Sequence, residues 1–258
     1  MARAKELNFF VARGSWAKGV DWYAAQFDGR ATVRGESSPA YTNYPVHDGV
    51  PARMHSVVPD AKLIFLVRDP IERIVSQYIH DYSAGKVDRP IDETLAAGIS
   101  AHPYVMRSKY FLQLEQYLAF FPREQILVLA QEDLLHDRAP TMSQVFEFLE
   151  VDPLPIQVPH EKQRFLPQVR LVIDSKDCAT HEALEPGDIV IDNPNLGRQV
   201  IRRPSRVCRE QFERYVEMAA PLTLPPSERG RLFSEYFEAF LPPFEEILDR
   251  HITQWRDP

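Results

Sequence analysis

The feature that most constrains the fold is a short apolar segment followed directly by a turn and a helical pattern. Residues 61–67 are rich in branched apolar side chains, which is typical of a buried parallel strand. In the Arg68-Asp69-Pro70 turn, Asp69 suits a helix N-cap and Pro70 suits the first helical position. Apolar residues then recur at helical spacing through Tyr82: Ile71, Ile74, Val75 and Tyr78. The segment predicts a strand, a tight turn and a helix.

The same alternation continues along the chain. A helical pattern covers residues 110–120, Pro122 ends it, and residues 125–129 predict a second buried strand. A loop is expected at Asp133-Leu134, followed by a helix over residues 140–149. Because helices alternate with short hydrophobic strands, the sequence predicts an α/β fold, with a P-loop-like parallel sheet flanked by helices in a single domain covering residues 1–258.

The second half of the chain has weaker patterns. Residues 227–251 predict a C-terminal helical region that is interrupted at Pro242-Pro243. Residues 159–204 are expected to form an irregular or inserted segment with a short strand at residues 188–191. This segment also holds a basic cluster of three side chains: Arg198, Arg202 and Arg203.

Net charge, the length of the apolar stretches and the cysteine count limit the kinds of partner and compartment that the chain suits. The formal net charge of −7 disfavours nucleic acid, because a negative surface repels a phosphate backbone, and a small or neutral acceptor fits better than a long sulfated polysaccharide. The apolar stretches are far shorter than the roughly 20 residues that a membrane span needs, and the N-terminus lacks a secretory pattern. A cytoplasmic protein is expected. The two cysteines, Cys178 and Cys208, indicate neither a disulfide framework nor a metal site.

The Arg68 turn is the strongest candidate for a binding site. An arginine at the carboxyl end of a buried strand lies where open α/β sheets bind ligands, and Ser76, two helical turns on, can face the same cleft. A guanidinium and a hydroxyl at a helix start together suit a phosphate group. The structural alternative is that Arg68 pairs with a carboxylate and Ser76 is only a small helix residue.

Several motifs then resemble one enzyme family. The Arg-Asp-Pro turn with a serine eight residues after the arginine is similar to the 3′-phosphate motif of sulfotransferases that use 3′-phosphoadenosine 5′-phosphosulfate (PAPS). Residues 5–10 resemble the Lys-Glu-x-x-Phe-Phe segment of the heparan-sulfate-type and bacterial branch. Trp22-Tyr23, residues 35–41 and residues 110–133 resemble further segments of that branch in order and spacing. The resemblance covers residues 3–150 well and is patchy afterwards.

This resemblance implies a function and a set of site residues. Arg68 and Ser76 would hold the 3′-phosphate of the PAPS donor, and Glu6 would be the catalytic general base on an acceptor hydroxyl or amine. Arg198, Arg202 and Arg203 would form a second arm around the 3′-phosphate, unless they are a solvated charged loop. The acceptor would be a small molecule, a lipid or a saccharide, and no metal is implied.

Two departures from the family pattern affect the expected activity. The family's phosphosulfate-binding loop precedes the Lys-Glu-x-x-Phe-Phe segment, so the chain is expected to be N-terminally truncated relative to the family and impaired in donor binding and transfer. Either the start is misassigned or the chain is a catalytically degenerate nucleotide-binding or scaffold homologue. Ser37 also stands where heparan-type enzymes often have a lysine. A small kinase is a third reading, although the sequence lacks the Gly-x-x-x-x-Gly-Lys-Ser/Thr pattern.

Overall fold

The chain divides into two compact units. The computed structural model describes residues 1–83, 86–87, 89, 91–96, 101–152, 168–171, 189–193, 197–201, 226–249, 251–252 and 255–256. The first unit comprises Met1–Ile74, Leu95–Pro153 and Leu224–Pro258, and the second comprises Val75–Thr94 and Leu154–Thr223. The boundary between them passes through helix α3 (Pro70–Ser83).

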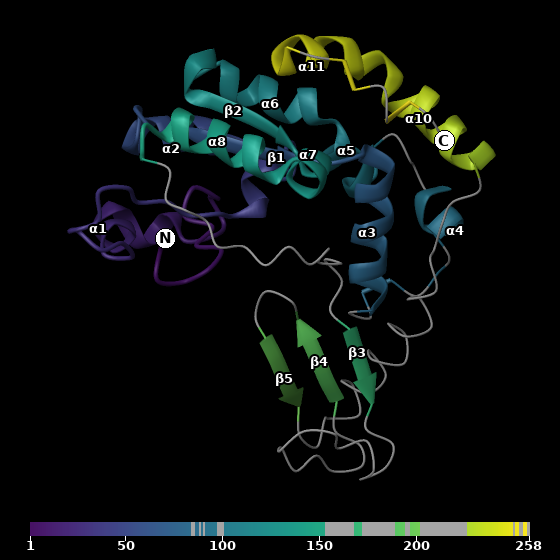
Figure 1. Ribbon diagram of the computed structural model, residues 1–258, viewed down its shortest axis with the longest axis horizontal. Coiled ribbons are helices and arrows are strands. Elements are labelled where there is room, and N and C mark those ends of the chain that lie inside the picture. Colours follow the sequence, from purple (N-terminus) through teal and green to yellow (C-terminus); the bar gives the residue numbers. More distant parts are fainter. Residues whose placement is uncertain are drawn as a thin grey trace. The chain divides into compact units, whose positions relative to one another are not determined.

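A pair of parallel strands forms the centre of the first unit. Strand β1 (Leu63–Val67) pairs with β2 (Ile126–Ala130), in a register that places Leu63 opposite Ile126 and Val67 opposite Ala130. Both predicted strands and their parallel pairing are therefore confirmed, and Figure 1 shows them among the helices of this unit. Because parallel strands end at the same edge, the residues after Val67 and after Ala130 lie next to each other.

Strand β1 is less buried than its composition predicts. Ile64 and Leu66 are 43% and 50% exposed, whereas Val67 is buried and Phe65 packs edge-on against Tyr110. One face of β1 is therefore covered and the other is open in the described part of the protein. A continuous apolar run favours burial on both faces, and among the described residues only one face of β1 is covered, so the prediction of a buried strand holds for one face.

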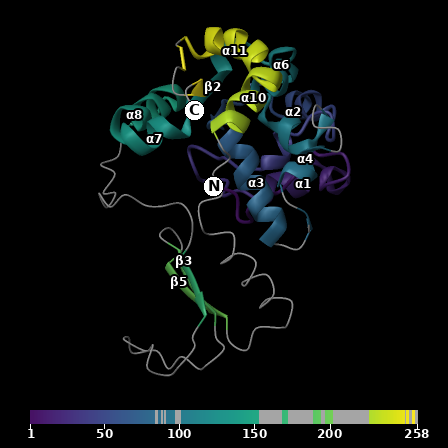
Figure 2. The same ribbon diagram turned by 90° about the vertical axis from the view of Figure 1, so that its right-hand side faces the viewer.

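Helices pack around this strand pair. Helix α6 (Tyr110–Leu118) precedes β2, and α7 (Gln131–His136) and α8 (Arg138–Leu149) follow it. Figure 2 shows α7 and α8 on a different side of β2 from α10 (Pro226–Tyr236) and α11 (Leu241–Leu248). The loop predicted at Asp133-Leu134 was wrong, because these residues lie within α7.

The C-terminal break also differs from the prediction. The helix is interrupted at the 3-10 turn η6 (Glu238–Phe240), and Pro242 and Pro243 lie in the first turn of α11. Proline is tolerated there because the first amides of a helix have no intrahelical acceptor, so the two prolines begin a helix and do not break one. In the core beside α11, the rings of Phe244 and Trp255 stack at 6.1 Å.

The remaining elements are short. The second unit holds an antiparallel sheet of β3 (Gln168–Leu171), β4 (Ile189–Asn193) and β5 (Gly197–Ile201), which the sequence did not predict beyond the strand near residue 189. The other helical segments are η1 (Trp16–Lys18), α1 (Gly19–Ala24), η2 (Pro39–Thr42), α2 (Val50–Val57), α4 (Ile91–Ala96), α5 (Pro103–Ser108) and η4 (Arg123–Gln125). Within the described ranges, no helix has the length and apolar character to cross a membrane.

Candidate active site

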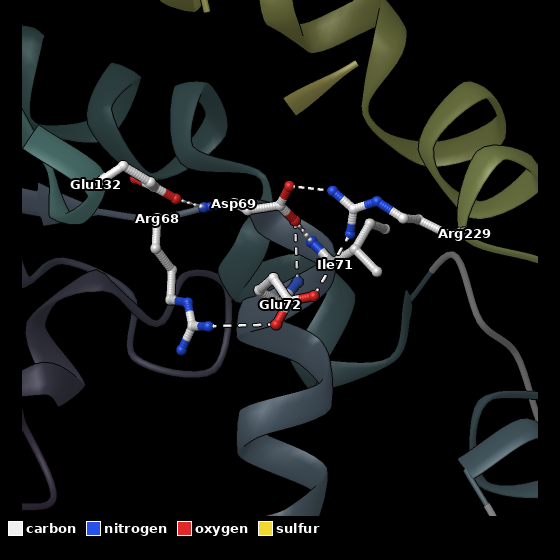
Figure 3. Close-up of polar contacts among 6 residues, drawn as sticks. All are labelled: Arg68, Asp69, Ile71, Glu72, Glu132 and Arg229. Carbon is white, nitrogen blue, oxygen red and sulfur yellow. Dashed lines mark hydrogen bonds and ion pairs between the residues drawn. The ribbon is translucent and has the colours of Figure 1, made fainter. Parts of the chain in front are cut away.

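The turn between β1 and α3 is fixed by its own acidic residue. The Oδ1 atom of Asp69 accepts hydrogen bonds from the amides of Ile71 at 2.8 Å and Glu72 at 3.0 Å, which is the predicted N-cap. The Asp69 amide in turn donates to Oε1 of Glu132, on the helix that follows β2, at 2.8 Å. These bonds, shown in Figure 3, fix the backbone that carries Arg68 at the edge of the sheet.

Arg229 binds the same turn from the C-terminal part of the chain. Its guanidinium donates to Oδ2 of Asp69 and lies 3.7 Å from Glu72 (Figure 3). The side chains of Arg229 and Asp69 are 15% and 8% exposed, so this ion pair is largely removed from solvent. These ion pairs connect helix α10 to the start of α3.

Arg68 faces a single carboxylate. Its Nη2 lies 3.5 Å from Oε2 of Glu72, one turn into α3 (Figure 3). Across the residues that the structure describes, the Arg68 guanidinium has no other ion pair, and Glu72 is about half exposed. The structural alternative considered for Arg68 therefore holds in part: it does pair with a carboxylate. The pair is solvent-exposed and weak, so it leaves the guanidinium available to a stronger anion.

A second guanidinium lies close to this site and was missed from the sequence. Nη1 of Arg73 is 3.4 Å from the carbonyl of Tyr104 and 3.3 Å from Oγ of Ser108, and no carboxylate pairs with it within the described residues. Burial lowers the pKa of Arg73, and the positive charges of Arg107 and Arg68 lower it further. A bound anion would relieve this repulsion. The available signal was an arginine five residues after Arg68.

Tyr110 has a structural role in this region. It is buried among Phe65, Phe244 and Trp255, and burial raises the pKa of its hydroxyl above the ordinary value. Its hydroxyl has no hydrogen-bond partner in the described part of the chain. These ring contacts place Tyr110 in the core of the first unit.

The predicted base lies in an unusual turn. Glu6 is exposed, and both Glu6 and Asn8 have positive backbone φ angles, of 56° and 48°. For residues other than glycine this left-handed conformation costs about 1–2 kcal/mol each, so other contacts must hold it. The Asn8 side chain supplies one by donating to the Glu6 carbonyl at 3.1 Å.

Three side chains from one downstream segment hold this turn. Ser38 Oγ accepts a hydrogen bond from the Asn8 amide, and the Tyr41 hydroxyl accepts one from the Phe9 amide, both at 3.0 Å. Both hydroxyls donate to Glu36, at 2.9 Å from Ser38 and 2.6 Å from Tyr41. We call Glu36, Ser38 and Tyr41 the Glu36 clasp. The sequence marked this segment only by its family resemblance.

The other residues predicted to bind the phosphate lie in the second unit or outside the described residues. Ser76 lies on α3, exposed, in the second unit, and Arg198 lies on β5 of the same unit. Arg202 and Arg203 lie outside the described residues. Their joint role in binding a phosphate stays a prediction.

Comparisons with known proteins identify the class. The model of the sulfotransferase domain family matches residues 2–167. Heparan sulfate glucosamine 3-O-sulfotransferase 5 of Mus musculus is 27% identical over 161 residues, which cover 58% of this chain and 46% of the relative. Heparan sulfate glucosamine 3-O-sulfotransferase 3B1 of Homo sapiens is 33% identical over 146 residues, covering 52% and 36%. The chain spans less than half the length of these relatives.

A solved structure agrees at the level of the fold. The crystal structure of a sulfotransferase from Alicyclobacillus acidocaldarius matches 99% of this chain and 87% of its own, with a TM-score of 0.61 and 21% identity. An α/β fold with guanidinium groups at the carboxyl end of a parallel strand is suited to binding an anionic ligand. With the family model matching more than half of its residues, this chain belongs to the sulfotransferase domain family.

Proposed function

We propose that this chain transfers a sulfuryl group from PAPS to a hydroxyl or amine acceptor. Family membership supports sulfuryl transfer in general. The observation that carries the choice of donor is Arg68, a guanidinium at the carboxyl end of β1 whose only ion pair among the described residues is the weak one with Glu72. A donor with a ribose 3′-phosphate offers the doubly charged anion that would outcompete one carboxylate.

The donor's 3′-phosphate would be held at the start of α3. Arg68 would contact it through its planar fork of donors, and Ser76 would add a hydroxyl, as the family resemblance implies. Arg73 would add positive charge, since it lacks a carboxylate partner within the described ranges. The Asp69 cap consumes the first amides of α3, so side chains and not the helix N-terminus would supply most of the binding.

Glu6 would act on the acceptor. The acceptor oxygen or nitrogen attacks the sulfur, the bond from sulfur to the bridging phosphate oxygen breaks, and adenosine 3′,5′-bisphosphate leaves with that electron pair. Glu6 takes the proton that the acceptor loses. An exposed carboxylate suits this step because an incoming acceptor can reach it. The turn that carries it is fixed, since its backbone amides donate to the side-chain hydroxyls of Ser38 and Tyr41.

The acceptor class follows from the relatives only as a proposal. Relatives named for heparan sulfate glucosamine favour a saccharide. Ser37, in place of the lysine of heparan-type enzymes, counts against glycan-specific chemistry, and the net charge of −7 favours a small or neutral acceptor over a polyanion. The test is incubation with ³⁵S-labelled PAPS and a panel of neutral glucosamine oligosaccharides, heparan-type oligosaccharides, phenols and lipid alcohols. Labelled product with any acceptor supports the proposal, and no product from the whole panel contradicts it.

Replacing Glu72 with glutamine should strengthen donor binding. The substitution removes the carboxylate that pairs with Arg68 at 3.5 Å and would repel a phosphate at the same place. Because the pair is exposed, we expect a gain of about three- to fivefold in affinity for adenosine 3′,5′-bisphosphate, shrinking as salt is added. Isothermal titration calorimetry at low and high salt measures both effects.

The control for this prediction is Glu238→Gln, which removes an exposed carboxylate of the same charge from the 3-10 turn η6. If Glu72→Gln binds the bisphosphate no better than Glu238→Gln does, Glu72 does not compete for the phosphate site.

A further inference from the structure

The backbone that carries Glu6 is held through a chain of polar contacts that ends at one carboxylate. Each clasp hydroxyl has a single proton, and each donates it to an oxygen of Glu36. The lone pairs of these hydroxyls then remain free to accept the amides of Asn8 and Phe9. Each hydroxyl therefore connects one backbone amide to the Glu36 carboxylate. We call each of these two connections a relay.

We propose that Glu36 is a positioning residue, which orients the carboxylate of Glu6 for proton removal by fixing the left-handed turn through Ser38 and Tyr41. The proposal rests on the proposed sulfuryl transfer. Glu6 and Asn8 both hold positive φ angles, and the amides on the C-terminal side of that turn are the ones that the clasp accepts. Without these acceptors the turn would relax toward ordinary backbone angles, and the Glu6 side chain would move with it.

The contacts around the clasp support a rigid arrangement. Burial raises the pKa of the Tyr41 hydroxyl, and its hydrogen bond to Glu36 raises it further, so the hydroxyl stays protonated and able to donate. The ring of Phe9 stacks on Tyr23 at 4.3 Å. A Cβ at Gly14 would lie 2.4 Å from the Asn8 carbonyl, so the backbone at Gly14 packs closely against this turn.

Glutamine cannot replace Glu36 in this role. Its amide has one oxygen that accepts and one nitrogen that only donates, so it cannot accept from both hydroxyls in the present arrangement. The hydroxyl that faces the amide nitrogen would lose the acceptor for its proton, so its orientation toward the backbone amide would no longer be fixed. Tyr41→Phe removes the hydroxyl that accepts the Phe9 amide and keeps the ring. Ser38→Ala removes the hydroxyl that accepts the Asn8 amide, with the smallest change in packing.

The test combines kinetics with hydrogen exchange. For Glu36→Gln and Tyr41→Phe we expect kcat to fall about 10- to 100-fold with the KM for PAPS within about twofold, and the amides of residues 8–10 to exchange faster. In a Glu6→Gln background, Glu36→Gln should lower kcat no further, because there is no base left to orient. The control is Thr42→Val, which removes a neighbouring hydroxyl that donates to the Pro39 carbonyl at 3.4 Å and has no contact with Glu36 among the described residues, and it should match the wild type.

The outcomes separate this proposal from the proposed function. If the wild type transfers sulfate and both Glu36→Gln and Ser38→Ala keep its kcat, the positioning role is overturned and the proposed function is not. Additive losses in the Glu6→Gln background would also overturn it, since they would indicate a general structural defect. If Glu36→Gln fails to fold, Ser38→Ala carries the same test. A wild-type protein that sulfates no acceptor would overturn the proposed function, and the positioning role with it.

Discussion

Replacing Glu6 with glutamine is expected to lower kcat for sulfuryl transfer by about 100- to 10,000-fold, the usual contribution of a general base. Glutamine keeps the shape of the side chain and removes its ability to take a proton. Because Glu6 lies on an exposed turn and has no role in holding the donor, affinity for adenosine 3′,5′-bisphosphate should stay within about twofold of the wild type. Steady-state kinetics with labelled PAPS and calorimetry with the bisphosphate measure the two effects.

The matched control for Glu6 is Glu124→Gln, which neutralises another exposed glutamate, on the 3-10 turn η4. It should leave kcat unchanged. A Glu6→Gln variant that keeps more than a tenth of wild-type kcat would exclude Glu6 as the base, and a parallel loss of nucleotide affinity would indicate that Glu6 acts in binding instead.

Replacing Arg229 with methionine is expected to destabilise the protein by about 3 kcal/mol or more, which is typical of removing one partner of a buried ion pair. The change leaves the Asp69 carboxylate buried with its charge uncompensated, although the amides of Ile71 and Glu72 still donate to it. It also removes the ion pairs that connect α10 to the start of α3. Urea unfolding at neutral pH measures the loss.

Arg231→Met is the control on the same helix. Arg231 is half exposed and pairs with Glu228 and Glu235 in solvent, so its replacement should have a far smaller effect. Equal unfolding midpoints for the two variants would show that the Arg229 pair adds nothing beyond a surface contact.

The sequence predicted the elements that depend on local signals. Strands β1 and β2 and helix α3 appear within a few residues of their expected ends, because apolar periodicity, the Asp69 cap and Pro70 are all encoded within one stretch of chain. The parallel pairing of β1 with β2 followed from the helices between them. The α/β class of the fold was therefore predictable.

Contacts between distant segments were not predictable. Arg229 lies 160 residues after Asp69, and nothing in the composition of either segment indicates that they meet. The left-handed turn at Glu6 and Asn8 was equally hidden, since positive φ is expected mainly at glycine. That turn exists because hydroxyls about 30 residues away accept its amides.

The candidate site was predicted in part. Arg68 was found because its position after a buried strand is a general feature of ligand sites in α/β proteins. Glu72 and Arg73 were read only as part of the helix that follows, although the structure places one as the partner of Arg68 and the other as a guanidinium with no carboxylate partner in the described ranges. Sequence spacing indicates which residues share a segment, but it does not show which charged side chains pair with one another in the folded protein.

In the proposed function, Arg68 recognises the ribose 3′-phosphate of the donor. The most direct measurement compares adenosine 3′,5′-bisphosphate with adenosine 5′-monophosphate, which lacks that phosphate, for the wild type and Arg68→Ala by calorimetry. Loss of a charged hydrogen-bonding contact predicts about 10- to 150-fold weaker binding of the bisphosphate, with binding of the monophosphate within about twofold. Equal losses for the two nucleotides, or no loss for either, would contradict the assignment of Arg68 to the 3′-phosphate.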